Sequence, residues 1–281
     1  MPGIENYGVY NDRMRRSMWD KAFFMDKIPG ADVLIDYGCA DGSLIAFLQG
    51  LFPGMRFIGY DVDRSMIASA AGRGIENAWF FSETAEVLER LRALNADPSG
   101  VAVNFSSVFH EVFHYGYDLK AVGGFIRAVS PQYLVVRDMM YCSADPKASA
   151  PAEAVRLVRS GLPEWQIRDF EKCWGPLSLR KNLVHLLLKY RYTENWEREC
   201  AENYFSYSEE MLLRTLDPGG RYRRILCLRY VLPWIRYDME NRFGIDPGDE
   251  FTTHFAMILS AGNQRNMVSL NLNAPCGIQR G

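Results

Sequence analysis

The chain has 281 residues, of which 48% are hydrophobic and 23% charged, and its formal net charge is −2. These values exclude a largely disordered chain, and no run of about eighteen uncharged apolar residues is present to span a membrane. The near-neutral charge also excludes a global attraction to nucleic acid or anionic lipid. The six cysteines lie far apart without a C-x-x-C pair, which is typical of reduced thiols. Because the N-terminus lacks a signal-peptide pattern, we expect a cytoplasmic protein.

The first half of the chain alternates short apolar runs with helix-like stretches. An amphipathic helix is expected over residues 11–27, before Pro29 and Gly30. The expected strands are 33–35, 56–60, 78–81, 101–104 and 133–137, and the expected helices between them are 43–51, 64–73, 84–94 and 119–129. This rhythm predicts parallel βαβ units and a doubly wound α/β sheet.

The rhythm stops near Tyr141, and the second half is organised differently. Residues 152–216 read as helical and rich in aromatic side chains, and strand-like runs return at 224–231 and 251–260. We therefore predict five segments, which are an N-terminal helical lid (1–28), an α/β core (29–146), a helical cap or substrate insert (147–223), a strand pair that completes the sheet (224–262) and a flexible tail (263–281).

The turn after the first expected strand carries the strongest functional signal. Residues 36–42 read D-Y-G-C-A-D-G, so an apolar strand enters a tight glycine turn and then a helix. Glycines let the backbone approach a ligand, and the helix N-terminus offers free N–H groups. The G-x-x-x-G spacing disfavours the G-x-G-x-x-G turn of an NAD site. Asp61, which follows the second strand, stands where a carboxylate can accept both ribose hydroxyls of an adenosine ligand.

Between residues 31 and 138, and again at the C-terminal strand pair, the chain resembles the class I S-adenosylmethionine (SAM) dependent methyltransferases. The family's first motif, acidic-x-Gly-x-Gly-x-Gly, is similar to residues 36–42, with Ala40 in place of the middle glycine. The resemblance implies a seven-stranded, mostly parallel sheet with the helical insert between strands five and six. It also implies an enzyme that uses S-adenosyl-L-methionine and releases S-adenosyl-L-homocysteine (SAH).

The same resemblance implies the cofactor-binding residues. Gly38 and Gly42 would line the methionine end, Asp61 would hold the ribose, and Cys39 would be a small turn residue rather than a nucleophile. The full implied set is Asp36, Gly38, Cys39, Gly42, Asp61, Val62, Ser82, Asn104 and Ser106.

Two residues after the fourth strand are the predicted catalytic pair. Methyl transfer from a sulfonium needs alignment of the reactants and removal of any acceptor proton. His110 lies near the carboxyl edge of the sheet, where open α/β sheets bind ligands, so we predict that it is the general base, with Glu111 orienting it or balancing its charge. The alternative is that the pair caps a helix or hydrogen-bonds within the fold.

Residues 110–114 also spell H-E-x-x-H, the pattern of zinc proteases. Three fixed letters are a weak signal, and the methyltransferase context explains the position without zinc. A loose resemblance to small-RNA 2′-O-methyltransferases would make His110, Glu111 and His114 ligands of a divalent ion, joined by a distant residue such as His185. We predict that the site holds no metal.

The acceptor of the methyl group is predicted from the charge of the chain and from the insert. We expect transfer to an oxygen or nitrogen. The near-neutral charge favours a small or medium-sized metabolite or a peptide side chain over nucleic acid, and no membrane partner is expected. An RNA or nucleotide acceptor bound by basic residues of the insert is an alternative, and so is a non-catalytic SAM-binding scaffold. Arg137 and Asp138 end the fifth strand as substrate contacts or as a local ion pair, and His254 is expected to be a core or edge histidine.

Overall fold

The computed structural model describes residues 17–143, 145, 147–248 and 250–262, and within them seven strands form one sheet. The strands are β1 (Val33–Tyr37), β2 (Arg56–Tyr60), β3 (Ala78–Phe81), β4 (Val101–Ser106), β5 (Tyr133–Met139), β6 (Tyr222–Tyr230) and β7 (His254–Ala261). Their order is β3-β2-β1-β4-β5-β7-β6, and β7 runs antiparallel to β5 and β6 while the other pairs are parallel. The predicted doubly wound fold is confirmed, and the strand ends differ from the predicted ones by at most three residues.

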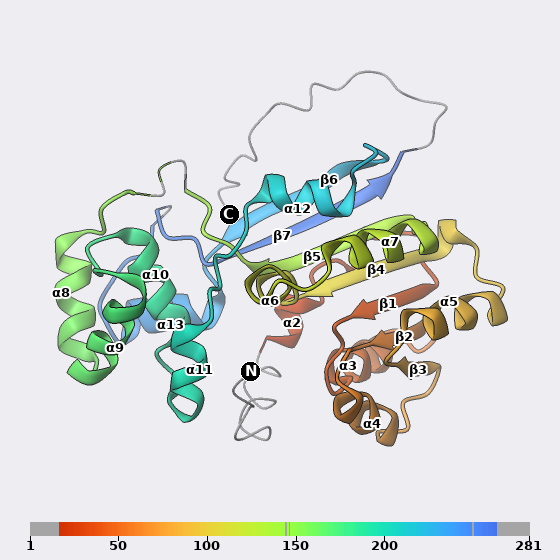
Figure 1. Ribbon diagram of the computed structural model, residues 1–281, viewed down its shortest axis with the longest axis horizontal. Coiled ribbons are helices and arrows are strands. Elements are labelled where there is room, and N and C mark those ends of the chain that lie inside the picture. The colour runs from red at the N-terminus through yellow and green to blue at the C-terminus, as the bar shows by residue number, and fades with distance from the viewer. Residues whose placement is uncertain (1–16, 144, 146, 249, 263–281) are drawn as a thin grey trace.

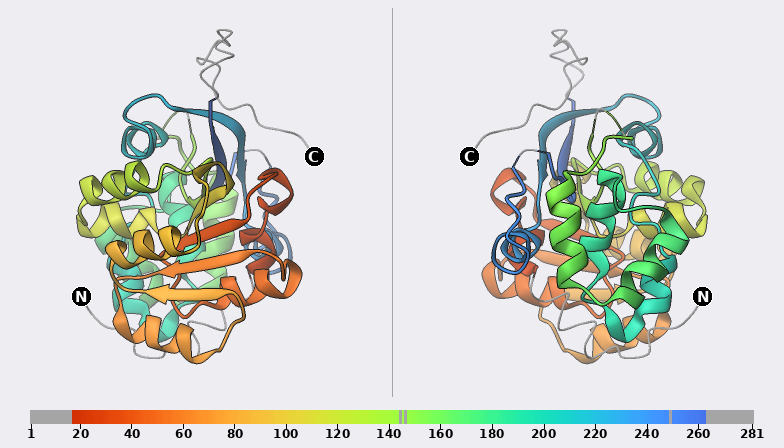
Figure 2. Two further views of the ribbon diagram at one scale, coloured as in Figure 1. Left: turned by 90° about the vertical axis from the view of Figure 1, so that its right-hand side faces the viewer. Right: turned by 90° about the vertical axis from the view of Figure 1, so that its left-hand side faces the viewer.

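Helices cover both faces of this sheet (Figure 2). Alternate residues of a strand face opposite sides, so Val33 and Ile35 pack in one core and Leu34 packs in the other. The first core lies against α5 (Thr84–Ala93), α6 (Phe109–Tyr115), α7 (Leu119–Val129) and α12 (Glu209–Leu216), and the second against α2 (Met18–Lys21), α3 (Ser43–Leu51) and α4 (Arg64–Gly72). Burial on both faces explains why the central strands are continuous apolar runs.

A separate group of helices lies beyond the carboxyl end of β5 (Figure 1). It consists of α8 (Ala152–Gly161), α9 (Glu164–Trp174), α10 (Arg180–Lys189), α11 (Trp196–Ala201) and α13 (Pro233–Asn241). These helices share a core of their own, in which Phe170, Leu183 and Ile235 are fully buried. Helix α12 follows α11 in sequence but packs on the sheet against α7, whereas α13 comes from the β6–β7 connection and joins the helical group. None of the described helices is long and apolar enough to cross a membrane.

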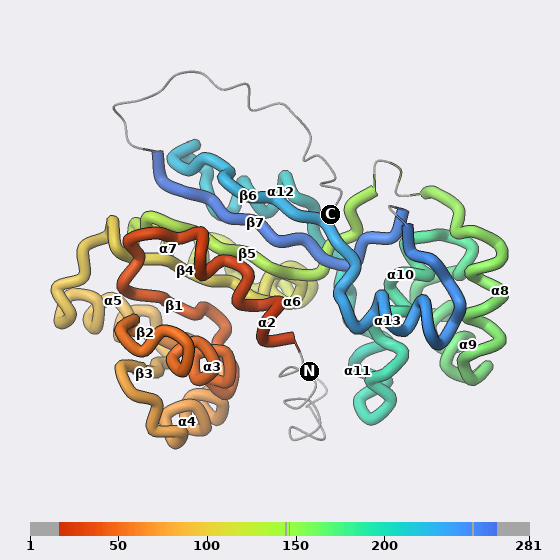
Figure 3. The backbone as a smooth tube through the Cα atoms, turned by 180° about the vertical axis from the view of Figure 1, so that it is seen from behind, coloured from red at the N-terminus to blue at the C-terminus, as the bar shows by residue number. Residues whose placement is uncertain are grey.

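The N-terminal segment differs from its prediction. A single helix was expected over residues 11–27, but the structure has the short helix α2 and a 3-10 turn at Met25–Lys27. Phe24, between the two, is fully buried, and this tertiary packing overrides the local helical preference. Residues 1–16 of the predicted lid and the predicted flexible tail (263–281) lie outside the described residues. Figure 3 shows α2 between the sheet and the helical group, where Asp20 hydrogen-bonds to side chains of β5 and β6.

Candidate functional site

The first element of the site is a cavity of about 350 Å³ at the carboxyl ends of β1, β2 and β4. We call it the glycine-turn cavity because the turn between β1 and α3 forms one wall. Six of the nine residues that the resemblance implies for the cofactor line it, namely Asp36, Gly38, Cys39, Asp61, Val62 and Ser106. Parallel strands end together at this edge of the sheet, which is why residues so far apart in sequence meet there.

The other three residues of that set do not line the cavity, and two of them support its walls. Asn104 is fully buried and donates from Nδ2 to Asp36 Oδ1 at 2.7 Å, so it holds the Asp36 carboxylate. Gly42 is the N-cap of α3 with φ 72°, and a Cβ there would lie 3.0 Å from Ala70 Cβ. Ser82 follows β3 and is half-buried.

Glycine is required at position 38 for two reasons. Its φ is +81°, a conformation that L side chains rarely adopt, and a Cβ there would lie 2.6 Å from Val108 Cγ2. The close approach of the turn to Val108 thus depends on the missing side chain. Cys39 beside it is buried, and burial together with the Asp36 charge raises the pKa of its thiol well above the usual value. A thiol so held is unsuited to nucleophilic chemistry.

Asp61 closes the β2 side of the cavity and has one backbone partner on each carboxylate oxygen. Ala40 N–H donates to Oδ2 at 2.9 Å, and Asp63 N–H donates to Oδ1 at 2.9 Å. A carboxylate oxygen accepts more than one hydrogen bond, so both oxygens can still receive ligand hydroxyls. Burial raises the pKa of Asp61, and the two N–H donors oppose that shift.

The second element of the site is His110 on α6, which Asp138 at the end of β5 holds in place. Nδ1 of His110 lies 2.7 Å from Asp138 Oδ1, and the backbone N–H of His110 donates to Asp138 Oδ2 at 3.1 Å. On the other side of the ring, Nε2 lies 3.6 Å from Glu202 Oε1. Burial by itself lowers the pKa of His110, but the charge and hydrogen bond of Asp138, followed by the charge of Glu202, raise it to about 9.

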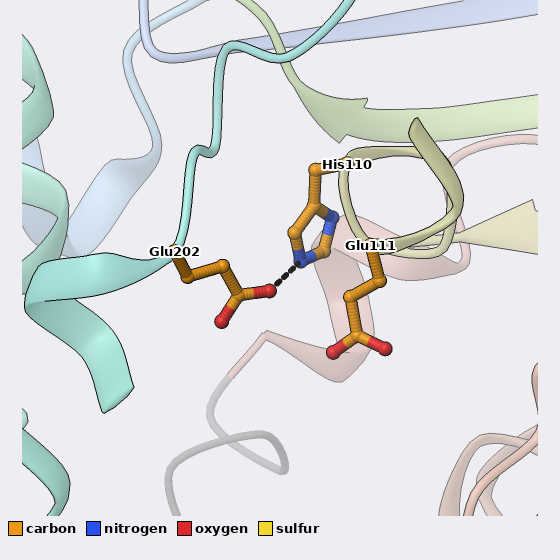
Figure 4. Close-up of side chains that lie close together, drawn as sticks. All are labelled: His110, Glu111 and Glu202. Carbon is orange, nitrogen blue, oxygen red and sulfur yellow. Dashed lines mark ion pairs between the residues drawn. The ribbon is translucent and has the colours of Figure 1, made fainter. Parts of the chain in front are cut away.

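Glu111 does not orient the imidazole in the way the sequence suggested. The carboxylate that is hydrogen-bonded to the ring is that of Asp138, while Glu111 accepts a hydrogen bond from Arg198 at 3.2 Å. Figure 4 shows His110, Glu111 and Glu202 converging from α6 and from the segment after α11. Arg198 also lies 3.7 Å from Glu202 Oε2, so one guanidinium faces both glutamates. Glu111 therefore contributes charge near His110 but is held by Arg198.

Glu202 is buried, and its Oε1 accepts no hydrogen bond within the described residues. Burial raises the pKa of Glu202 to about 7, although the charge of His110 opposes the rise. Ligand atoms of His110, Glu111 and Glu202 all lie within 4.8 Å of one another, which makes this the one group among the described residues whose side chains could hold a metal ion. The protonated His110 ring and Arg198 already place two positive charges next to the carboxylates of Glu111 and Glu202.

The two histidines that the sequence offered as partners of His110 lie elsewhere. His114 Nδ1 accepts from the backbone N–H of Asn203 at 3.4 Å, and His185 Nε2 accepts from that of Tyr204 at 3.4 Å. Neither belongs to the group that could hold a metal. The H-E-x-x-H spacing therefore does not form a zinc-protease site, because α6 directs its second histidine to the backbone of the segment after α11.

A small chamber of about 70 Å³ surrounds His110 and Glu202, and we call it the histidine chamber. It shares Lys21, Ser107 and Glu111 with the glycine-turn cavity, so the two spaces adjoin. Lys21 is buried at this boundary, and burial followed by the Arg137 charge lowers its pKa to about 8. His254 also lines the chamber and is fully buried, with Nδ1 3.0 Å from Thr253 Oγ1.

The neighbours Arg137 and Asp138 have separate partners because strand residues alternate between the two faces. Arg137 is buried, donates from Nε to Asp20 Oδ2 at 2.7 Å and from Nη1 to Ser107 Oγ at 2.9 Å. It thereby ties α2 to the loop after β4. The two do not form an ion pair with each other; Asp138 pairs with His110.

The positions of three side chains around His110 were not predicted from the sequence. Asp138 was expected to contact the substrate or to pair with Arg137, but it lies 2.7 Å from the His110 ring instead. An acid at the carboxyl edge of a parallel sheet is a signal for such a position. Lys21 and Glu202 come from the N-terminal helix and from the inserted segment, and nothing local in the sequence brings them to His110. Only the tertiary fold does so.

No protein-family model matches the chain, and no curated protein matches it. Among solved structures, it is similar to the plantazolicin methyltransferase BamL in complex with a triazolic desmethylPZN analog and SAH, at 11% identity over 90% of this chain and 88% of that chain, with a TM-score of 0.48. It is also similar to a SAM-dependent methyltransferase from Archaeoglobus fulgidus (16% identity, 91% and 100% covered, TM-score 0.47) and to the methyltransferase domain of bacterial CtHen1 (14%, 89% and 99%, 0.47). At identities of 11–16% these similarities concern the fold alone, so the function is inferred from the geometry of this chain's own site.

Proposed function

We propose that this protein is a SAM-dependent methyltransferase that methylates an oxygen or nitrogen of a small or medium-sized metabolite or of a peptide side chain. The observation that supports the proposal is that the glycine-turn cavity and the histidine chamber adjoin each other. The glycine-turn cavity has the walls that an adenosine cofactor needs, and the adjoining histidine chamber contains a positioned imidazole. A reaction between a cofactor in one space and an acceptor in the other would take place at their shared boundary.

The residues of the glycine-turn cavity fit the cofactor. Asp61 keeps acceptor capacity on both oxygens for the two ribose hydroxyls, and Gly38 brings the backbone close to the ligand. Lys21, buried at the boundary with the histidine chamber, is placed to receive the carboxylate of the methionine end. When bound, SAM supplies a sulfonium methyl group that is already strongly electrophilic.

His110 removes the proton from the acceptor atom. Asp138 accepts the hydrogen bond from Nδ1, which leaves Nε2 facing the chamber as the atom that takes the acceptor proton. Asp138 and Glu202 then stabilise the imidazolium that forms. Because the same carboxylates raise the pKa of His110 to about 9, the ring carries its proton at neutral pH and becomes a base as the pH rises.

The acceptor class follows from the size of the chamber and from the charge around it. A chamber of about 70 Å³ admits only the reacting end of a molecule, and the chain as a whole has a formal charge of −2. Proteins that bind a nucleic-acid backbone owe most of their affinity to a strongly basic surface. A net charge of −2 does not imply such a surface. Both facts favour a metabolite or a single side chain over a nucleic acid.

The test uses SAM labelled with tritium in the methyl group. The protein is incubated with separate small-molecule, protein and RNA fractions of a cell extract, and transferred label is counted in each. We expect label in the small-molecule or protein fraction and its loss with His110→Asn, while the control His114→Asn retains it. Label confined to RNA would overturn the acceptor class, and full transfer by His110→Asn would overturn the base.

A further inference from the structure

The histidine chamber is too small to contain a whole acceptor. Its volume of about 70 Å³ has room for only a few heavy atoms, since a cavity needs roughly 10–15 Å³ of such volume to hold a single water. Its walls are fixed by the bonds of His110 to Asp138 and of Arg198 to Glu111. An acceptor that presents one atom to His110 therefore needs a second space for the rest of the molecule.

Such a space adjoins the chamber and shares no lining residue with the glycine-turn cavity. A cavity of about 460 Å³ lies between the α8–α9 junction, the end of α10 and helix α13, and we call it the aromatic cavity. It shares Tyr192 and Trp234 with the histidine chamber, so these two side chains stand between the spaces. Its volume is in the range of small-molecule binding sites.

The walls of the aromatic cavity are flat rings with two guanidinium groups above them. Arg191 lies 5.3 Å from the ring centroid of Trp234, and Arg242 lies 5.0 Å from that of Tyr190. Tyr192 adds a further aromatic side chain at the end nearest the histidine chamber. Aromatic walls of this kind bind planar groups by stacking, with an indole as the largest surface.

The charge of this cavity is positive. Arg191 is neutralised by Asp238, with which it forms an ion pair. Arg242 donates one hydrogen bond, to the backbone oxygen of Gly161 at 3.3 Å, and no ion pair of it is found within the described residues. No carboxylate lines the cavity among those residues. A guanidinium without a carboxylate, next to aromatic walls, is suited to an anionic substituent on a ring.

We infer that the aromatic cavity binds the distal part of the acceptor, a planar ring that carries a carboxylate or a phosphate monoester, while the atom to be methylated enters the histidine chamber past Tyr192 and Trp234. The inference rests on the proposed function and extends it to the acceptor's chemical class. Arg242 recognises the anion, and Trp234 stacks on the ring. The acceptor is thus an elongated small molecule with its anionic end away from the cofactor.

The test measures binding of matched probes to the SAH-saturated protein by ligand-observed NMR. One arm compares 2-naphthoate with 2-naphthylmethanol, and the other compares adenosine 5′-monophosphate with adenosine. We expect the anion of at least one pair to bind about tenfold more tightly than its uncharged partner, as a charge-assisted hydrogen bond allows. Arg242→Gln removes that preference, and Trp234→Leu weakens binding of both members of the pair.

The matched control is Arg236→Gln, a change within α13, the helix that Arg242 directly follows. Arg236 is exposed and pairs with Glu240 instead of lining the cavity. We expect this variant to bind the anionic probe as much more tightly than its uncharged partner as the wild type does. Absence of saturable binding of all four probes up to millimolar concentration, or an anion preference that survives Arg242→Gln, overturns the inference. SAH affinity, measured on the same samples, separates failure of this inference from failure of the proposed function.

Discussion

Asp138 holds His110 through two different groups, accepting from the backbone N–H with Oδ2 and lying 2.7 Å from ring Nδ1 with Oδ1. One carboxylate at the end of β5 thus sets both the start of α6 and the orientation of the imidazole. This pairing fixes which ring nitrogen faces the chamber, and with Glu202 it determines the protonation state of His110.

The first prediction concerns the titration of His110. The chain has four histidines, and the pKa values of His114, His185 and His254 are all lowered, by burial first and then by nearby positive charges. An NMR titration of the ring protons will show one histidine with a midpoint of about 9, raised by Asp138 and Glu202 against the effect of burial. Asp138→Asn will lower that midpoint, whereas a resonance that keeps its midpoint in the variant would contradict the assignment.

The second prediction concerns stability and pH. The folded-state pKa of His110 is raised from 6.5 to about 9, so folding favours its protonated form. The stabilisation is present in full below about pH 6.5 and is lost as the pH rises through about 9. The difference in unfolding free energy between the wild type and His110→Gln, measured by urea denaturation, will shrink across this range. A difference that stays constant or grows with pH would refute the linkage.

The third prediction concerns Gly38. An alanine there must adopt φ +81° and place Cβ 2.6 Å from Val108 Cγ2, so Gly38→Ala will cost about 1–3 kcal/mol of unfolding free energy and weaken SAH binding. Adding Val108→Ala will restore part of the loss, because it removes the contact but not the backbone strain. The control Gly54→Ala, where a Cβ would meet nothing within 4 Å, will change stability by less than about 0.5 kcal/mol. Equal effects of the two glycine changes would count against this account.

The fourth prediction concerns metal. Arg198 faces both Glu111 and Glu202, so the charges of the group that could hold an ion are already compensated. We expect a chelator to leave SAH affinity and Tm unchanged, and manganese titrations followed by paramagnetic resonance to show no tight binding. Arg198→Ala will increase manganese affinity by freeing the two carboxylates. Stoichiometric binding by the wild type that Glu202→Gln abolishes and the exposed control Glu210→Gln retains would show that a metal belongs to the site.

Much of the core was predictable because its signals are local. Asp36 near the end of β1, Asp61 directly after β2 and the glycine turn between β1 and α3 each depend on a few neighbouring residues. Parallel strands bring them to one edge of the sheet. The position of His110 at this edge followed from the same rule. Gly42, which was expected to line the methionine end, is the N-cap of α3 and is not among the residues that line the cavity.

The surroundings of His110 could not be predicted in the same way. Glu202 lies 92 positions after His110, and its place depends on how the helices of the insert pack with α13, which comes from still further along the chain. Residue spacing within an amphipathic helix predicts which face is buried, not which helix covers it. For the same reason, nothing in the local sequence indicates that Glu202 is buried beside an imidazole.

The central claim is that the glycine-turn cavity binds SAM, and calorimetry tests it most directly. Titration of SAM, SAH and NAD into the purified protein should show micromolar binding of SAM and SAH and none of NAD. Asp61→Ala should weaken SAH by about 1.5–3 kcal/mol through lost charge-assisted hydrogen bonds, while Asp63→Ala, which removes the exposed N-cap of α4, should leave the affinity nearly unchanged. Binding of NAD in place of SAM, or an SAH affinity that Asp61→Ala does not alter, would contradict the account.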